Sequence, residues 1–243
     1  LPLMRPDGLL AASLCVVMNW FEPLILLVTA DGSILDRRHG SDERVPDDLK
    51  QATSLRSVLS APVCNEWLGL IRDVNRTQTA ACAWAIMDGR GYQLVCTPQA
   101  QDAGGSGAPL CLLSLLHAPA CLSEFAPPQD VRATVLRAHE WGALDCLSRS
   151  QLDTLRSITL GLTNPEIASK TCRSKRAVEW HIRFLNDQLQ VSSRERLAAI
   201  GRRACLCCIS DDDWNVILRA RPARRANAPM QAVACSQPTL WPM

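Results

Sequence analysis

The segment SKRAVEWHIRFLNDQL, residues 174–189, carries side chains of the types that recognise nucleic acid. Arginine contacts guanine edges or phosphates through paired hydrogen bonds, glutamate accepts from cytosine N4, and an aromatic ring packs on a thymine methyl group. Lys175 stands at the expected helix start, where backbone N–H groups also bind phosphate. On a helix, one face collects five side chains that suit such contacts: Arg176, Glu179, Trp180, Arg183 and Asp187.

The opposite face of the same helix is apolar. Val178, Ile182, Leu185 and Leu189 recur at helical spacing and predict one stripe that packs on a core. By itself, a basic amphipathic helix is more often a solvated surface helix than a nucleic-acid reader. Only the elements that surround the helix can therefore decide between a surface helix and a nucleic-acid-binding helix.

Those elements are short, well-capped helices. Capping signals open four helices within about 50 residues: Ser148–Gln151, Asn164–Pro165, Ser174 and Ser192–Glu195. Gly161 supplies a stop for the first helix, and Cys172–Ser174 forms a three-residue turn between the second and third. A short helix, a tight turn and a longer basic helix make the helix-turn-helix arrangement.

Three phrases in this region, GLTNPEIA, S-x-R-x-V-x-W-H and LQVSSRER, make residues 147 to about 206 resemble the LuxR-type DNA-binding domain. The resemblance implies base-facing roles for Glu179, Trp180 and Arg183. It implies DNA-backbone contacts near four further residues: Asn164, Lys175, Arg176 and Val178. It also implies a structural role for His181 and dimerisation through the helix that begins at Arg194.

The chain departs from the family pattern at several positions. Thr171, Cys172 and Arg173 replace a leucine, a frequent glycine and an apolar residue in the turn, and Ser150–Gln151 replaces an Arg-Glu pair. Glu179 and Asp187 stand where basic residues are frequent. A cysteine in a turn that prefers a left-handed residue adds strain, and acidic side chains oppose phosphate. We therefore expect weaker DNA binding, or binding that relies more on dimerisation.

The first half of the chain predicts strands and helices in a different order. Apolar runs at 24–28 and 33–35 flank an Asp-Gly turn, residues 46–76 have helical spacing, and strands are expected at 80–87, 92–97 and 109–117. This order, with the phrase ILLVTADGSIL, resembles a PAS sensor domain over residues 20–120. A generic α+β interaction domain fits the order equally well.

The first half of the chain lacks the residues that several known classes of sensor domain use to bind a ligand or a phosphoryl group. The Asn-Cys-Arg-Phe-type motif of flavin-adduct photosensors is absent, and Asp31 alone does not make the acidic pair of a receiver domain. His39 and His117 are the histidines available for haem, and a strand-end polar role suits His117 better. One tyrosine, Tyr92, argues against an acyl-homoserine-lactone pocket. An unidentified small-molecule ligand is left open.

Composition and charge agree with an ordinary globular protein that has one basic module. Of 243 residues 47% are hydrophobic, and the net charge of +2 combines +6 over residues 148–205 with −4 elsewhere, which favours a polyanionic partner for that module. The twelve cysteines are scattered and read as reduced thiols of a cytoplasmic protein, without metal or cofactor; a metal site at the cluster of Cys205, Cys207 and Cys208 is the less favoured alternative. No nucleophile–base pair, phosphate loop or membrane span is recognisable, so we expect neither an enzyme nor a membrane protein.

The sequence therefore predicts an α+β protein with a PAS-like mixed-sheet sensor domain (1–125) and a four-helix helix-turn-helix domain (147–208). A helical linker at 126–146, with a helix over 129–141, joins the two domains. A basic tail follows at 209–243; it is expected to begin with a short helix from Asp211 to Leu218 and to be disordered beyond that helix. The expected function is that of a transcriptional regulator that binds double-stranded DNA as a homodimer through helix 175–189. The alternative is a degenerate relative that works as a protein–protein interaction module.

Overall fold

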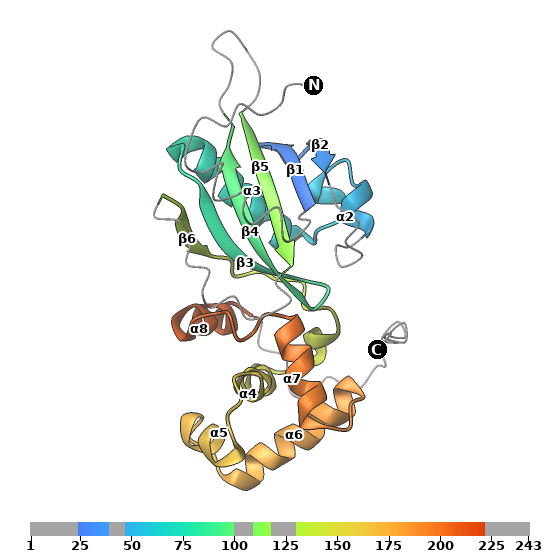
Figure 1. Cartoon of the computed structure of the whole chain (residues 1–243), viewed down its shortest axis with the longest axis vertical. Coiled ribbons are helices and arrows are strands. Elements are labelled where there is room, and N and C mark those ends of the chain that lie inside the picture. The colour runs from blue at the N-terminus through green and yellow to red at the C-terminus, as the bar shows by residue number, and fades with distance from the viewer. Residues whose placement is uncertain (1–23, 39–46, 100–108, 118–129, 222–243) are drawn as a thin grey trace.

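The computed structural model describes residues 24–38, 47–99, 109–117 and 130–221. It has an upper half built on a β-sheet and a lower half built of helices (Figure 1). The sheet is mixed and helices make up the rest, so the chain is an α+β protein as expected. Within the described ranges no helix is both long and apolar enough to cross a membrane.

Six strands form the sheet in the order β2-β1-β5-β4-β3-β6. Their bounds are β1 Leu24–Thr29, β2 Ile34–Arg38, β3 Ala81–Met87, β4 Arg90–Pro98, β5 Leu110–His117 and β6 Arg132–Val135. The predicted hairpin is confirmed, because β1 and β2 pair antiparallel on either side of the Asp31–Gly32 turn. The expected order of two strands, helices and three strands is also observed over residues 24–117.

Helix α3 (Ala61–Thr77) packs one of its faces on the sheet, and that face forms part of the upper core. Its residues Trp67, Leu68 and Ile71 are fully buried with strand residues such as Tyr92 and Leu94. Two smaller elements precede it, α2 (Asp47–Gln51) and the 3-10 helix η1 (Leu55–Ser57). Helical spacing of the apolar residues at 63–74 predicted this burial.

The predicted linker helix over 129–141 is wrong in the part that the structure describes. Residues 132–135 instead form β6, which pairs parallel to β3, and Gly142–Cys146 form a 3-10 helix, η2. A side-chain carboxylate holds the segment between β6 and η2. Glu66 of α3 accepts from the backbone N–H groups of Arg137 and Ala138. Pairing with β3 satisfies the backbone groups that a helix would have bonded internally.

Five helices follow in the lower half: α4 Arg149–Thr159, α5 Asn164–Lys170, α6 Lys175–Leu189, α7 Arg194–Arg203 and α8 Asp211–Ala220. The predicted capping box of Ser148 and Gln151 is confirmed, as is the cap at Ser174. Two caps differ from the prediction by one residue: α5 is capped by Thr163 and α7 by Ser193. Glu166, three residues after Thr163, accepts its N–H and O–H, which explains the shift.

The short helix expected from Asp211 to Leu218 is confirmed as α8, which belongs to the lower core, and the ordered structure continues to residue 221, into the start of the segment expected to be disordered. Trp214 is only 2% exposed, and its indole N–H donates to Asp153 of α4. Arg221, just after the helix, is buried as well; its guanidinium lies over the Trp141 ring and donates to the carbonyls of Asp145 and Leu147. The predicted tail beyond residue 221 lies outside the described residues.

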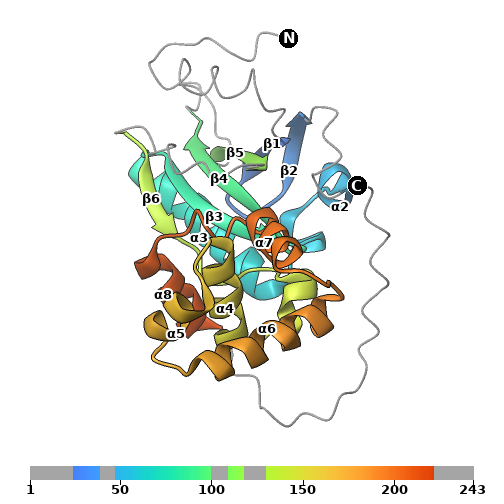
Figure 2. The same ribbon diagram turned by 60° about the horizontal axis from the view of Figure 1, so that its bottom comes forward.

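The two halves meet at the end of β3 and the start of β4. The side chain of Ile86 belongs to the lower core, and Trp141 meets Trp214 edge to face, with 6.3 Å between ring centroids. At Gly91, a Cβ atom would come within 2.4 Å of Cys205 Cβ, so only glycine allows this approach. Helix α8 lies below β6 in both views (Figures 1 and 2).

Candidate nucleic-acid interface

Helix α6 lies at the end of the molecule farthest from the sheet (Figure 1). The side chains of Val178, His181 and Leu185 are buried and pack it on the lower core, while Ile182 and Leu189 are half-buried at the edge of that stripe. The apolar stripe predicted from the sequence is therefore the packed face of α6. Its other face is turned toward solvent.

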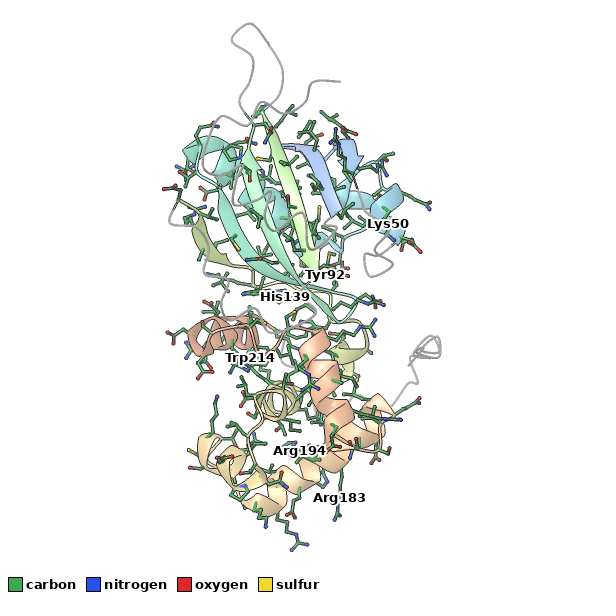
Figure 3. All side chains as sticks on the ribbon, viewed as in Figure 1. Lys50, Tyr92, His139, Arg183, Arg194 and Trp214 are labelled. Carbon is green, nitrogen blue, oxygen red and sulfur yellow. The ribbon has the colours of Figure 1, made fainter. Side chains whose placement is uncertain are left out.

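The outward face carries the charged residues singled out in the sequence. Lys175, Arg176 and Arg183 are exposed, and Glu179 is half-buried between them. Figure 3 shows Arg183 extending away from the body of the protein. Asp187, one turn farther along, is also exposed and reduces the positive charge of this face.

An aromatic pair stands next to the arginines. Trp180 is 57% exposed, which is unusual for so large an apolar side chain, and its ring lies 5.6 Å from that of Phe184 at a tilt of 32°. The edge of His181 supports the same indole at 5.1 Å. The two neighbours hold the indole in one orientation, so Trp180 presents a flat apolar surface to a partner.

The first turn of α6 combines a capped helix end with positive charge. Ser174 Oγ accepts from the N–H of Ala177, and Lys175 and Arg176 stand exposed beside it. The aligned peptide dipoles add partial positive charge at this end of a 15-residue helix. This end of α6 therefore suits an anionic group such as a phosphate.

Two other residues predicted to lie near DNA have different surroundings. Val178 is fully buried, so its side chain cannot reach a ligand and only its backbone lies near the surface. Asn164 is half-buried, and its side-chain oxygen accepts from Arg194 Nη1 at 2.7 Å. The same guanidinium contacts the carbonyl oxygen of Leu162 and thereby ties α7 to the start of α5.

The turn between α5 and α6 is a regular left-handed C-cap in spite of its sequence. Cys172 has φ +52°, its N–H donates to Ser169, and the N–H of Arg173 donates to Ala168 at 2.9 Å. These two bonds are those of a Schellman motif, in which glycine is the usual left-handed residue. The strain expected at Cys172 is therefore present, and the turn closes nonetheless.

Arg173 continues from this turn to two other elements. Its Nη2 donates to Ser150 Oγ of α4 at 2.7 Å, and its Nη1 contacts Nε2 of His181 in α6. Burial, and next the positive charge of Arg173, lower the pKa of His181. Both effects disfavour the charged imidazolium of His181 inside the bundle, which agrees with the structural role expected for it.

Sequence reasoning missed the roles of Arg173 and Arg194, because their partners lie 23 to 32 residues away in the chain. No local pattern encodes such contacts. Within the described ranges, no three His, Cys, Asp or Glu side chains come together in a way that would hold a metal ion.

Comparison with known proteins gives loose structural likenesses. No protein-family model and no curated protein matches the chain. A solved structure described as the Vibrio cholerae VqmA dimer, a LuxR-type receptor, in the absence of target DNA is 12% identical over 84% of this chain and 92% of its own, with a TM-score of 0.37. A Vibrio cholerae VqmA–ligand–DNA complex has the same identity and coverage and a TM-score of 0.39.

A domain of an HTR-like protein from Haloarcula marismortui covers a smaller part of the chain. It is 22% identical over 39% of this chain and 96% of its own, with a TM-score of 0.30. Such low identities and TM-scores do not assign the chain to a family. They leave its function to be argued from the geometry of its own residues.

Proposed function

We propose that the protein is a LuxR-type transcriptional regulator that reads double-stranded DNA with α6 under the control of its N-terminal domain. The observation that carries the proposal is the arrangement of α5, a tight turn and α6, with the outward face of α6 presenting Arg176, Arg183 and Trp180. A short helix followed by a basic recognition helix is the arrangement with which helix-turn-helix proteins enter the major groove.

The dimensions of α6 suit that groove. A helix of 15 residues is about 22 Å long, and the major groove admits a helix at a width of about 12 Å. With the exposed face inward, Arg183, Trp180 and Glu179 would meet base edges. Lys175 and Arg176 would meet a phosphate at the start of α6, and Asn164, at the start of α5, would lie near the DNA backbone.

The N-terminal half would act as a PAS-like sensor, with or without a small-molecule ligand. The support for this is its element order and the packing of α3 on one face of the sheet. The regulator would bind as a homodimer to two half-sites about one helical turn apart. We propose no enzymatic activity and place the protein in the cytoplasm.

One observation favours the alternative, a protein–protein interaction module. The exposed Trp180–Phe184 pair, beside the acidic Glu179 and Asp187, is a composition that also suits a protein partner. Aromatic residues are enriched in protein interfaces as anchors that fill pockets. The two functions differ in how binding responds to salt and in whether DNA is bound at all.

The regulator and the protein–protein interaction module can be distinguished by selecting, from random-sequence duplex DNA, the sequences that the full-length protein binds. We expect an enriched sequence, and an affinity for it that falls with salt at a log–log slope near −0.9 per phosphate contact. Arg183→Ala should cost about 1–3 kcal/mol of binding free energy if the side chain contacts a base. Arg56→Ala, an exposed arginine of the sheet half, is the matched control and should change nothing.

Absence of any enriched sequence from that selection would exclude the regulator. Equal losses on the enriched site and on random DNA in the Arg183→Ala protein would also contradict base reading. In that case Arg183 would be a phosphate contact, and the salt slope should become less steep by about 1.

A further inference from the structure

One guanidinium group connects helix α4, the turn between α5 and α6, and helix α6. Arg173 begins in the turn before α6, reaches Ser150 Oγ in the first turn of α4, and contacts the imidazole of His181 in α6. Arginine suits such a place because its planar group carries several donors in a fixed geometry. Ser150 lies 23 residues and His181 eight residues from Arg173 in the chain, and both meet at this side chain.

We propose that Arg173 is the positioning residue that sets the rotation of α6 relative to α4, and with it the direction in which the reading face points. The proposal rests on the function proposed above and deepens it. In this role Arg173 acts through His181 and Ser150, which its Nη1 and Nη2 groups contact, and not by touching a base.

Apolar packing decides which face of α6 turns outward, and a directional contact can refine the rotation within that limit. Val178 and Leu185 hold α6 against the core, but contacts between apolar side chains are not directional. His181 is the buried polar residue of the same face, and within the described ranges its Nδ1 has no hydrogen-bond partner. Its Nε2 therefore depends on Arg173 for a polar contact, and a directional bond to a buried ring orients the helix that carries it.

The left-handed turn aims the side chain. The Schellman bonds of Cys172 and Arg173 turn the chain back over the end of α5, so that the backbone of Arg173 is fixed before its side chain extends. A side chain that starts from a fixed backbone loses less entropy on binding its partners.

The two residues that meet here are both departures from the LuxR-type pattern noted in the sequence. That pattern has an arginine where this chain has Ser150 and an apolar residue where it has Arg173. In the structure Arg173 Nη2 lies 2.7 Å from Ser150 Oγ, so an arginine at position 150 would begin where the guanidinium of Arg173 ends. The two departures therefore meet at one hydrogen bond, and their exchange, with arginine at 150 and leucine at 173, would supply a guanidinium to this region from α4 instead.

The exchange defines the variants for a test in the full-length protein. Arg173→Leu removes the guanidinium, Ser150→Ala removes one acceptor, and the double variant Ser150→Arg/Arg173→Leu moves the guanidinium back to α4. Arg173→Lys keeps the charge but cannot contact both partners at once. Each protein is titrated with its selected DNA site and with random DNA at several salt concentrations.

We expect Arg173→Leu to weaken binding to the selected site about tenfold, the loss of one hydrogen bond to a charged group, and to leave binding to random DNA and the salt slope unchanged. Ser150→Arg/Arg173→Leu should recover most of that loss, and Arg173→Lys should lie between the two. A salt slope less steep by about 1 for Arg173→Leu would show a phosphate contact instead and overturn the proposal. So would an unchanged affinity for the selected site.

The imidazole provides a readout that does not depend on DNA. The ¹⁵N chemical shifts of His181 distinguish the ring nitrogen that accepts a hydrogen bond from the one that carries the proton. Nε2 should be the acceptor in the wild type and in Arg173→Lys and lose that signature in Arg173→Leu. If the wild type binds no DNA, the proposed function fails; an unchanged His181 spectrum in Arg173→Leu then also overturns the role of Arg173.

Discussion

Protonation of His139 should destabilise the protein in mildly acidic solution. His139 lies where the linker leaves the sheet, its Nδ1 accepts from the backbone N–H of Ile86 at 3.3 Å, and its ring stands edge to face with Trp141 at 5.5 Å. The ring lies between the upper and lower halves in Figure 3. Burial disfavours the charged imidazolium and lowers the pKa of His139 from 6.5 to about 4.

The size and sign of the effect follow from that pKa. As the pH falls from 6.5 to about 4, the unfolded chain binds a proton that the folded protein does not bind. The stability is therefore fully present above pH 6.5 and is lost as the pH falls. The whole difference corresponds to about 3 kcal/mol, of which about 2 kcal/mol is lost by pH 5.

Urea unfolding at pH 7.5, 6 and 5 measures the effect. Wild type should lose about 2 kcal/mol of unfolding free energy over this range, and His139→Gln, which keeps an acceptor for the N–H of Ile86, should lose much less. The pKa of His181 is lowered as well, so His181→Asn is the control that isolates its share. Carboxylates titrate mainly below this range. An equal pH dependence in wild type and His139→Gln would refute the reasoning.

Two further predictions concern backbone positions, with thermal unfolding as the measurement. Gly91→Ala should destabilise the junction of the two halves by about 1–3 kcal/mol, because the new Cβ would lie 2.5 Å from Cys205 Sγ. Gly69→Ala, with nothing within 4 Å, should instead gain about 0.5–1 kcal/mol; a similar loss at both sites would contradict the argument. Cys172→Gly should raise the free energy of unfolding by about 0.5–1 kcal/mol, because glycine adopts the left-handed conformation without strain. Ser169→Gly, in the preceding helix, is the control and should lower it by about the same amount. A lower stability of Cys172→Gly would show that the cysteine side chain stabilises the turn.

Elements with a strong local pattern were predictable from the sequence. Helix α6 had both an apolar stripe and a cap at Ser174, and the β1–β2 hairpin had two apolar runs around an Asp-Gly turn. The face of α6 that turns outward followed directly from the position of its buried stripe. For these elements, local propensity and burial agree.

The linker shows where this approach fails. The residues of β6 also have apolar spacing that suits a helix, and what decides their structure is pairing with β3, which lies about 50 residues earlier in the chain. Trp214 and Arg221 were missed for a similar reason, because their partners Asp153, Asp145 and Leu147 belong to segments 61 to 76 residues away. Contacts of this range leave no periodic signal in a single sequence.

The distance between α6 and the sheet has a consequence for how such a protein would be controlled. Helices α7 and α8 and the 3-10 helix η2 lie between the sheet and α6, so the sheet half cannot cover the reading face in this arrangement (Figure 1). In the homodimeric regulator proposed above, a signal in the upper half could act by changing the phase between the two α6 helices of the dimer. The two half-sites for such a dimer lie about 34–36 Å apart along the DNA. A rotation that moves each α6 by a few ångströms would therefore allow one α6 to enter the major groove while the other no longer faces it.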